Sequence, residues 1–327
     1  MSDASSAFGW LRKRLAELRG AGARDEPLLP RVAVVTDSAA ALPEEVQQAF
    51  AAGALTVVPM PVMVDGEIFS EGDAELGERL SLALAAGKPV KTSRPSPGQF
   101  EQVYQSLADQ GFDAVVSVHI SAELSGTVDA ARLAARRVAI PVEVLDSRTV
   151  AMAQGFGVRA ALVAAAAGGG SAAVAETARQ ALAGSKVFFY VPSLEQLRRG
   201  GRIGNAASWL GTVLAIKPLL SVADGRVVPL ERVRSASRAI ARVEELAREE
   251  LGLRTRPTSV AVHDFGNREQ ALELLAKIAD SAAPTEIFIS DLPSVLAAHV
   301  GLGVLAVVIS DLNGPVDPDI GRPQPSY

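Results

Sequence analysis

The chain has 327 residues, 48% of them hydrophobic, with a formal net charge of −5 and no cysteine. The lack of cysteine excludes disulfides, thiolate nucleophiles and zinc–thiolate sites. The acidic balance provides no electrostatic footprint for nucleic acid, and the longest apolar run, residues 160–167, is far shorter than the roughly 20 residues of a membrane span.

Residues 1–30 are interpreted as an N-terminal extension. Phe8, Leu11, Leu15 and Leu18 fall at helical spacing beside basic residues, which is typical of an amphipathic helix that contacts a membrane surface or covers a pocket. A solvated leader is the alternative interpretation. The segment lacks the basic start and continuous apolar stretch of a secretory signal, so we expect a cytoplasmic protein.

Short runs rich in Val and Ile predict buried strands along the rest of the chain. They are Val32–Val35, Val57–Val64, Val115–Ile120, Val142–Leu145, Val187–Val191, Val227–Val233, Val260–Val262, Ile287–Ile289 and Val304–Ile309. Helical patterns lie between many of them, at residues 43–50, 96–111, 236–252 and 267–280. This alternation predicts an α/β protein with a largely parallel sheet and flanking helices.

The glycine triplet Gly168–Gly170 follows an alanine-rich helical stretch and marks the expected boundary between two domains. We therefore predict an N-terminal α/β domain over residues 31–168 and a second α/β domain over residues 169–312. Residues 313–327 carry four prolines and are expected to form an irregular tail.

Hydroxyl-rich turns follow several predicted strands or precede helices. They are Thr36–Ser38, Lys91–Ser96, Ser121–Thr127 and Asp146–Thr149. Ligands of open α/β sheets bind beyond the carboxyl ends of the strands, where helix N-termini offer unpaired N–H groups to a carboxylate or phosphate. Each Ser or Thr also fits a plain helix N-cap, so spacing alone leaves both interpretations open.

The stretch from Leu194 to Gly204 is the most distinctive segment of the sequence. Paired glycines stop a helix, and Arg202 follows at a constrained turn, where we expect it to have a defined partner. The glycines follow a helix rather than a strand, which excludes a dinucleotide-binding fingerprint.

The histidines do not predict a metal site. His119, His263 and His299 are far apart in the sequence, and none forms an H-E-x-x-H pair. His299 precedes Gly301 and Gly303, where a close backbone approach would let its imidazole donate to an anion. A histidine satisfied by backbone near the core is the alternative. The sequence contains no P-loop and no G-x-S-x-G nucleophile motif.

Taken in order, these segments resemble the DegV family, the fatty-acid-binding subunits of bacterial fatty acid kinases. The resemblance covers nearly the whole chain from Val32 to Ile309. It is carried by VVTDSAAALP, VVPMPVMVDG, KTSRPSPGQF, SAELSGT, LDSRTVAMAQG, LEQLRRGGRIG, KPLL, VRSASRA and AAHVGLG.

The resemblance implies a two-domain α/β carrier that buries a long-chain fatty acid, with the carboxyl group near the domain junction. The residues that it places around the carboxyl group are Thr92, Ser93, Ser121, Ser125, Gly126, Thr127 and His299. Arg202 and Arg234 match arginines suited to docking a partner kinase or holding the transferred phosphate. The carrier itself would be non-catalytic and would need no cofactor, because the kinase would supply ATP, metal and catalytic groups.

Three departures from the family pattern leave the hydrogen bonds around the carboxylate open. Arg94 replaces a glutamine, Leu302 replaces a proline and Ala122 replaces a serine. Two other functions remain as alternatives: a stand-alone phosphotransferase or hydrolase that uses His299 and serines, and a lipid storage or sensing module without a kinase. The sequence does not predict acyl chain length.

Overall fold

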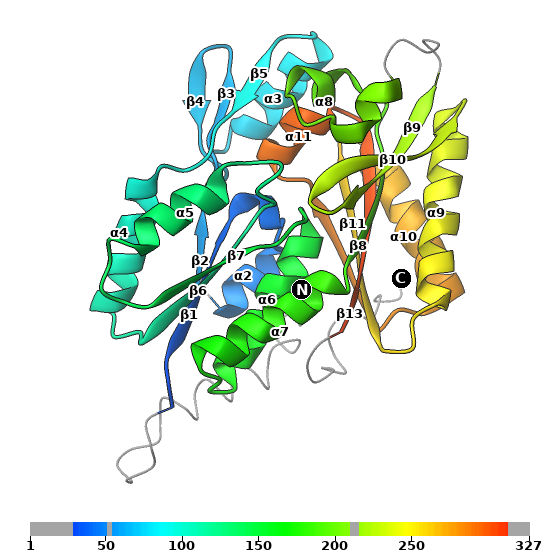
Figure 1. The fold of residues 1–327 in the computed structure, drawn as a ribbon. Coiled ribbons are helices and arrows are strands. Elements are labelled where there is room, and N and C mark those ends of the chain that lie inside the picture. The colour runs from blue at the N-terminus through cyan, green and yellow to red at the C-terminus, as the bar shows by residue number, and fades with distance from the viewer. Residues whose placement is uncertain (1–28, 51–53, 210–215, 313–327) are drawn as a thin grey trace, which may run out of the picture.

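The computed structural model describes residues 29–50, 54–209 and 216–312 (Figure 1). The predicted amphipathic helix and the proline-rich tail lie outside these residues. Among the helices that are described, none has the length and apolar character required to cross a membrane.

The first half of the chain forms a four-stranded parallel sheet in the order β2-β1-β6-β7. Its strands are β1 (Val32–Asp37), β2 (Leu55–Val58), β6 (Ala114–His119) and β7 (Val142–Asp146). Both faces are covered by helices: α4 (Pro97–Asp109) and α5 (Thr127–Ala135) on one, and α2 (Glu44–Phe50), α6 (Met152–Ala166) and α7 (Ser171–Ala183) on the other. Every residue of β1 and β6 is therefore buried, which explains their continuous apolar runs.

The helix α4 shows how local sequence sets an element boundary. The hydroxyl of Ser96 accepts a hydrogen bond from the Gln99 amide, and the Gln99 side chain accepts one from the Ser96 amide. Pro97 occupies the first helical position, where its missing N–H costs nothing. This capping box fixes the start of α4 directly after the loop of residues 93–95, which follows the strand β5 (Val90–Thr92).

The second half forms a six-stranded mixed sheet in the order β10-β9-β8-β13-β11-β12. Its strands are β8 (Lys186–Tyr190), β9 (Lys217–Ala223), β10 (Arg226–Val233), β11 (Thr258–Phe265), β12 (Glu286–Asp291) and β13 (Val304–Asp311). Only β11 and β12 pair in parallel; the other neighbours are antiparallel. The helices α9 (Ala236–Gly252) and α10 (Arg268–Ala282) cover its outer face, and its inner face packs against α6 and α7 (Figure 1).

A small antiparallel sheet, in the order β4-β3-β5, lies beside the two larger sheets. It consists of β3 (Val62–Val64), β4 (Glu67–Phe69) and β5 (Val90–Thr92), and it packs on α3 (Leu76–Ala85) and α11 (Ser294–Val300). The prediction of one strand over Val57–Val64 is wrong. Pro59 and Pro61 lack backbone N–H groups, so the run divides into β2 and β3, which belong to different sheets.

The glycine triplet forms the turn between α6 and α7. Gly168 adopts a left-handed conformation, with a φ of +83°. The strands β1 to β7 form the four-stranded and three-stranded sheets, whereas β8 to β13 form the six-stranded sheet. The division into two domains at residue 168 stays a prediction, because α6 and α7 share one core with both large sheets.

Candidate functional site

A cavity of about 340 Å³ lies where the small sheet and the six-stranded sheet meet the loops that follow β6 and β7. Its volume falls within the ~300–1,000 Å³ that is typical of small-molecule sites. Most of its wall is apolar: Met60, Ile120, Leu124, Val150, Ala151, Val187, Phe189, Leu197, Val222, Val227, Leu292, Val295, Leu296, Val300, Val304 and Ala306. The wall thus offers an environment for an apolar chain.

The polar groups of the wall are connected to one another. Thr92, Ser93, Arg94, Ser125, Gly126, Arg202 and His299 supply them. Thr92 Oγ1 and His299 Nε2 share a hydrogen bond of 2.8 Å, although 207 residues separate them in the sequence. Arg94 Nη1 donates to the Gly126 carbonyl, and Arg202 Nε donates to the Leu124 carbonyl. These contacts gather the polar groups at one end of the cavity.

His299 is a partly buried member of this polar group. Its Nδ1 is buried and has no hydrogen-bond partner among the described residues. Burial, with a smaller contribution from the Arg202 charge, lowers the pKa of His299 to about 4, so the imidazole is neutral at neutral pH. Gly200 packs against the ring, where a Cβ atom would lie 2.1 Å from Nδ1. Gly200 therefore makes room for the imidazole and also follows the last residue of α8 (Glu195–Arg199).

The turn from Ser121 to Thr127 contributes in two ways. Ser125 and Gly126 line the cavity. Thr127 is buried at the first position of α5, and its hydroxyl shares a hydrogen bond of 2.9 Å with the Ser125 hydroxyl. Thr127 thus positions the Ser125 hydroxyl through this hydrogen bond but does not itself line the cavity.

Ser121 does not lie in the cavity lining; it holds a neighbouring hairpin instead. Its hydroxyl donates to the Gly225 carbonyl over 2.8 Å, at the tip of the hairpin between β9 and β10. Gly225 has a φ of +80°, and a Cβ atom there would lie 2.4 Å from Ser121 Oγ. The tip also forms ion pairs from Arg226 to Glu123 and from Asp224 to Arg148. Val222 and Val227, on either side of the tip, form part of the cavity wall, so these contacts help to hold that part of the wall in place.

The two arginines singled out from the sequence are not neighbours. Arg202 lines the cavity, and its Nη1 donates to the Gly200 carbonyl over 2.6 Å. Arg234 is exposed beyond the other end of β10, with no hydrogen bond or ion pair in the part of the chain that is described. Gly204 packs on the backbone of Val227, near the start of β10, so the strand separates the arginines by roughly 20 Å.

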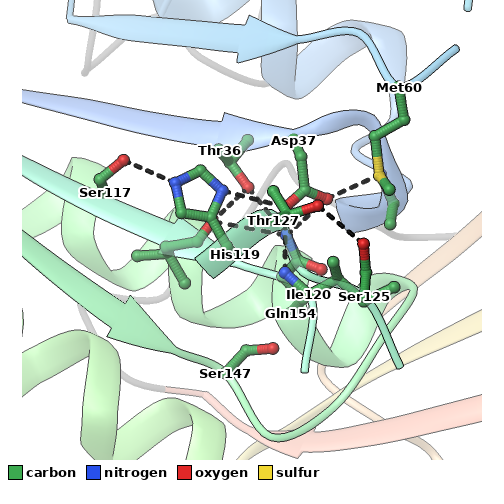
Figure 2. A network of polar contacts seen from close by, with 12 residues as sticks. Thr36, Asp37, Met60, Ser117, His119, Ile120, Ser125, Thr127, Ser147 and Gln154 are labelled. Atoms are coloured by element: carbon green, nitrogen blue, oxygen red, sulfur yellow. Dashed lines mark hydrogen bonds and ion pairs between the residues drawn. The ribbon is translucent and has the colours of Figure 1, made fainter. Parts of the chain in front are cut away.

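A second polar network, which was not predicted from the sequence, joins β1 to β6 (Figure 2). His119 Nδ1 lies 2.9 Å from Asp37 Oδ2, and His119 Nε2 lies 2.7 Å from Ser117 Oγ. The order Asp–His–Ser is that of a hydrolase triad, but the three residues have no exposed surface and do not line the cavity. Ser117 is also bonded to the Tyr104 hydroxyl, whose pKa is raised by burial.

We interpret the Asp37–His119–Ser117 network as structural. Asp37 Oδ2 additionally accepts from the Ile120 amide, and Oδ1 accepts from the Ala39 amide and from the Gln154 side chain. The carboxylate thus fixes the loops after β1 and β6 against α6. Within residues 29–50, 54–209 and 216–312, no three His, Asp or Glu side chains are grouped so that they could hold a metal ion.

The fold and this site define an α/β protein that encloses a mostly apolar cavity with one polar end rich in hydrogen-bond donors. A family model, described as an uncharacterised protein of the DegV family, matches residues 31–311. A DegV domain-containing protein of Streptomyces coelicolor is 42% identical over 280 residues, which cover 85% of this chain and 98% of the relative. The chain therefore belongs to the DegV family.

Solved structures of the family share the architecture. A DegV family protein of Thermus thermophilus, studied for its fatty acid binding, is 31% identical with a TM-score of 0.79, covering 86% of this chain and all of its own. DegV of Bacillus subtilis, a fatty acid binding protein, is 28% identical with a TM-score of 0.78 and the same coverage. The resemblance to the DegV family and the predicted two-domain α/β fold class are thus confirmed.

Proposed function

We propose that this protein is a fatty-acid carrier that buries a long acyl chain in its cavity and presents the carboxylate to a partner kinase for acyl-phosphate formation. The observation that carries the proposal is the combination of a mostly apolar wall with one connected polar end. The fatty acid binding of the Thermus and Bacillus relatives supports it.

The energetics of burial favour a long chain. Burying about 15 methylenes at roughly 0.8 kcal/mol each contributes about 12 kcal/mol before the costs of ordering the ligand. The wall offers aliphatic side chains such as Val187, Val222 and Ala306, and the described residues that line it include no carboxylate to oppose an acid head group.

The polar end is suited to a carboxylate. Thr92, Ser93 and Ser125 bring hydroxyl donors to the lining. When His299 Nε2 carries the proton and donates to Thr92 Oγ1, the Thr92 hydroxyl is free to donate to the ligand. His299 thereby orients Thr92 without adding a charge of its own.

A carrier fits the geometry of His299 better than the stand-alone enzyme does. A serine hydrolase needs a histidine between a serine and an orienting carboxylate. Within the described residues His299 Nδ1 has no hydrogen-bond partner, and His299 Nε2 shares a hydrogen bond with a threonine, Thr92. We therefore propose a non-catalytic subunit that works in the cytoplasm beside an ATP-dependent kinase.

Reconstitution tests the proposal. The purified chain, loaded with fatty acid, is mixed with the fatty acid kinase of its own organism and ATP, and acyl phosphate is trapped with hydroxylamine. We expect hydroxamate only when both proteins are present. Product from the chain and ATP alone would identify a stand-alone enzyme. Retained lipid without any product would leave a storage or sensing module.

A further inference from the structure

Arg94 places a fixed positive charge at the polar end of the cavity. Its Nη1 donates to the Gly126 carbonyl over 3.2 Å, and a Cβ atom at residue 126 would lie 2.5 Å from the same nitrogen. The exposed Arg94 side chain therefore packs closely against Gly126. Most of its N–H groups remain available to a ligand.

Arg202 holds the same turn from the other side of Ser125. Its Nε donates to the Leu124 carbonyl over 2.9 Å, whereas Arg94 is bonded to the Gly126 carbonyl. Ser125 lies between these two carbonyls and lines the cavity with both arginines. Two guanidinium groups from separate segments thus bond the carbonyls of the two residues that flank Ser125 in the sequence.

The positive charges of this pair are not balanced by protein groups. The cavity lining includes no Asp or Glu among the described residues, and the nearby Glu123 is paired with Arg226. Neither Arg94 nor Arg202 forms an ion pair in the described part of the chain. His299 is neutral at neutral pH, because burial lowers its pKa to about 4. A single carboxylate would therefore neutralise only one of the two charges.

We propose that Arg94 is a specificity-determining residue which, together with Arg202, makes the cavity prefer a long chain with a phosphoryl head group over the same chain with a carboxylate. A phosphoryl group carries up to two negative charges and three acceptor oxygens, which suit guanidinium donors on either side of Ser125. This inference rests on the proposed function. It adds that the carrier binds the phosphorylated form of its ligand more tightly than the free acid.

Three ligands of one chain length test the inference: a fatty acid, an alkyl phosphate monoester and an acylphosphonate that keeps the carbonyl group. Their dissociation constants are measured by displacement of a fluorescent fatty acid from the wild type, Arg94→Gln, Arg94→Lys and Lys91→Gln. Lys91 is the matched control, because it is an exposed cation on β5, three residues before Arg94, but does not line the cavity. Thermal unfolding of each variant confirms that it is folded.

We expect Arg94→Gln to weaken the two phosphorus ligands about tenfold and the fatty acid by less than about threefold. Arg94→Lys should keep part of the preference, since it retains the charge but loses the planar fork. A stronger effect on the acylphosphonate than on the monoester would identify acyl phosphate as the ligand, and equal effects would identify phosphoryl lipids in general. An unchanged ratio in Arg94→Gln, or the same change in Lys91→Gln, would overturn the inference. A wild type that binds none of the three would instead contradict the proposed function.

Discussion

At the residue scale, the contact between His299 and Thr92 joins α11 to β5, and in the proposed carrier it orients the Thr92 hydroxyl towards the head group. The hydrogen bond of 2.8 Å lies at the polar end of the cavity, and the other ring nitrogen is buried and has no partner in the described part of the chain. Replacing the ring removes the group that fixes the Thr92 hydroxyl, so the head group loses an oriented donor.

His299→Ala should therefore weaken fatty-acid binding about tenfold, the usual effect of losing one or two polar contacts in a partly buried site. Displacement of a fluorescent fatty acid measures the change, and a fatty alcohol of the same length serves as a ligand without the negative charge. An equal loss for acid and alcohol would show that the ring only supports the wall of the cavity.

The different positions of Arg202 and Arg234 lead to a second prediction. Arg234 is exposed at the far end of β10, so Arg234→Ala should leave fatty-acid affinity unchanged and lower the rate of acyl-phosphate formation with the kinase. Arg202 lines the cavity, so Arg202→Ala should lower both. Calorimetry with fatty acid and the coupled kinase assay separate the effects. An equal loss of fatty-acid affinity in both variants would contradict the different roles expected for Arg202 and Arg234.

At the element scale, the hairpin between β9 and β10 is held over the cavity by the Ser121 hydroxyl. Ser121→Ala leaves the Gly225 carbonyl without its protein donor, which should lower the free energy of unfolding by about 1–2 kcal/mol. It should also speed hydrogen exchange in the hairpin and release of the fatty acid. The control is Arg148→Ala, which removes only an exposed ion pair to Asp224 and should cost less than about 1 kcal/mol. Identical release rates in the two variants would show that the hairpin does not gate the cavity.

His263 connects β11 to β12 and to the start of α6. Its Nε2 accepts from the Met152 amide over 3.3 Å, so Nδ1 carries the proton that is shared with Ser290 Oγ over 3.0 Å. Burial lowers the pKa of His263 to about 4, whereas the unfolded chain keeps the ordinary value near 6.5. The unfolded state therefore binds more protons between these values, and stability is full above about pH 6.5 and falls as the pH decreases towards 4.

The loss attributable to His263 should be on the order of 3 kcal/mol between pH 7 and 4. Urea unfolding at several pH values measures it, with His263→Asn as the non-titrating comparison. The variant should be less stable at pH 7 but should lose less stability on acidification than the wild type. Parallel pH profiles for the two proteins would contradict the assignment.

The predicted elements show what local pattern can and cannot reveal. The buried strands of the parallel sheet were predictable, because helices cover both faces and their runs are continuously apolar. The prediction of a single strand over Val57–Val64 failed because the apolar residues continue through Pro59 and Pro61, where the chain passes from one sheet to another. The antiparallel pairing of β8, β9 and β13 was not predictable, since it depends on contacts between distant segments.

The same reason limits what the sequence reveals about the site. Thr92, Ser125 and His299 were predicted through the family resemblance, and the structure brings them to one cavity. Ser121 belongs to the same motif as Ser125, yet its hydroxyl turns to Gly225, which is 104 residues away in the chain. The Asp37–His119–Ser117 network was missed because nothing in the sequence pairs β1 with β6.

At the scale of the whole molecule, the cavity lies between structural layers that are joined by buried polar contacts. Arg159 on α6 forms a two-pronged ion pair with Glu286 on β12, which also accepts from the Ser259 hydroxyl. Glu286 has no exposed surface, so loss of Arg159 would leave a buried charge unpaired. The ion pair thus joins α6, which packs on the parallel sheet, to β12 of the six-stranded sheet.

A bulky residue in the wall of the cavity should exclude the ligand. Ala306 on β13 lines the cavity and is 5% exposed, so Ala306→Trp should fill the space that the acyl chain needs. Leu253 is 77% exposed and far from the lining, which makes Leu253→Trp the matched control. Circular dichroism and thermal unfolding verify that both variants are folded before ligand content is compared.

Mass spectrometry of an organic extract from the purified, denatured protein tests the central claim most directly. We predict a fatty acid near one equivalent per chain in the wild type and in Leu253→Trp, and a large loss in folded Ala306→Trp. Its mass would also give the chain length. A wild type that contains no lipid and takes up none from added fatty acid would contradict the account.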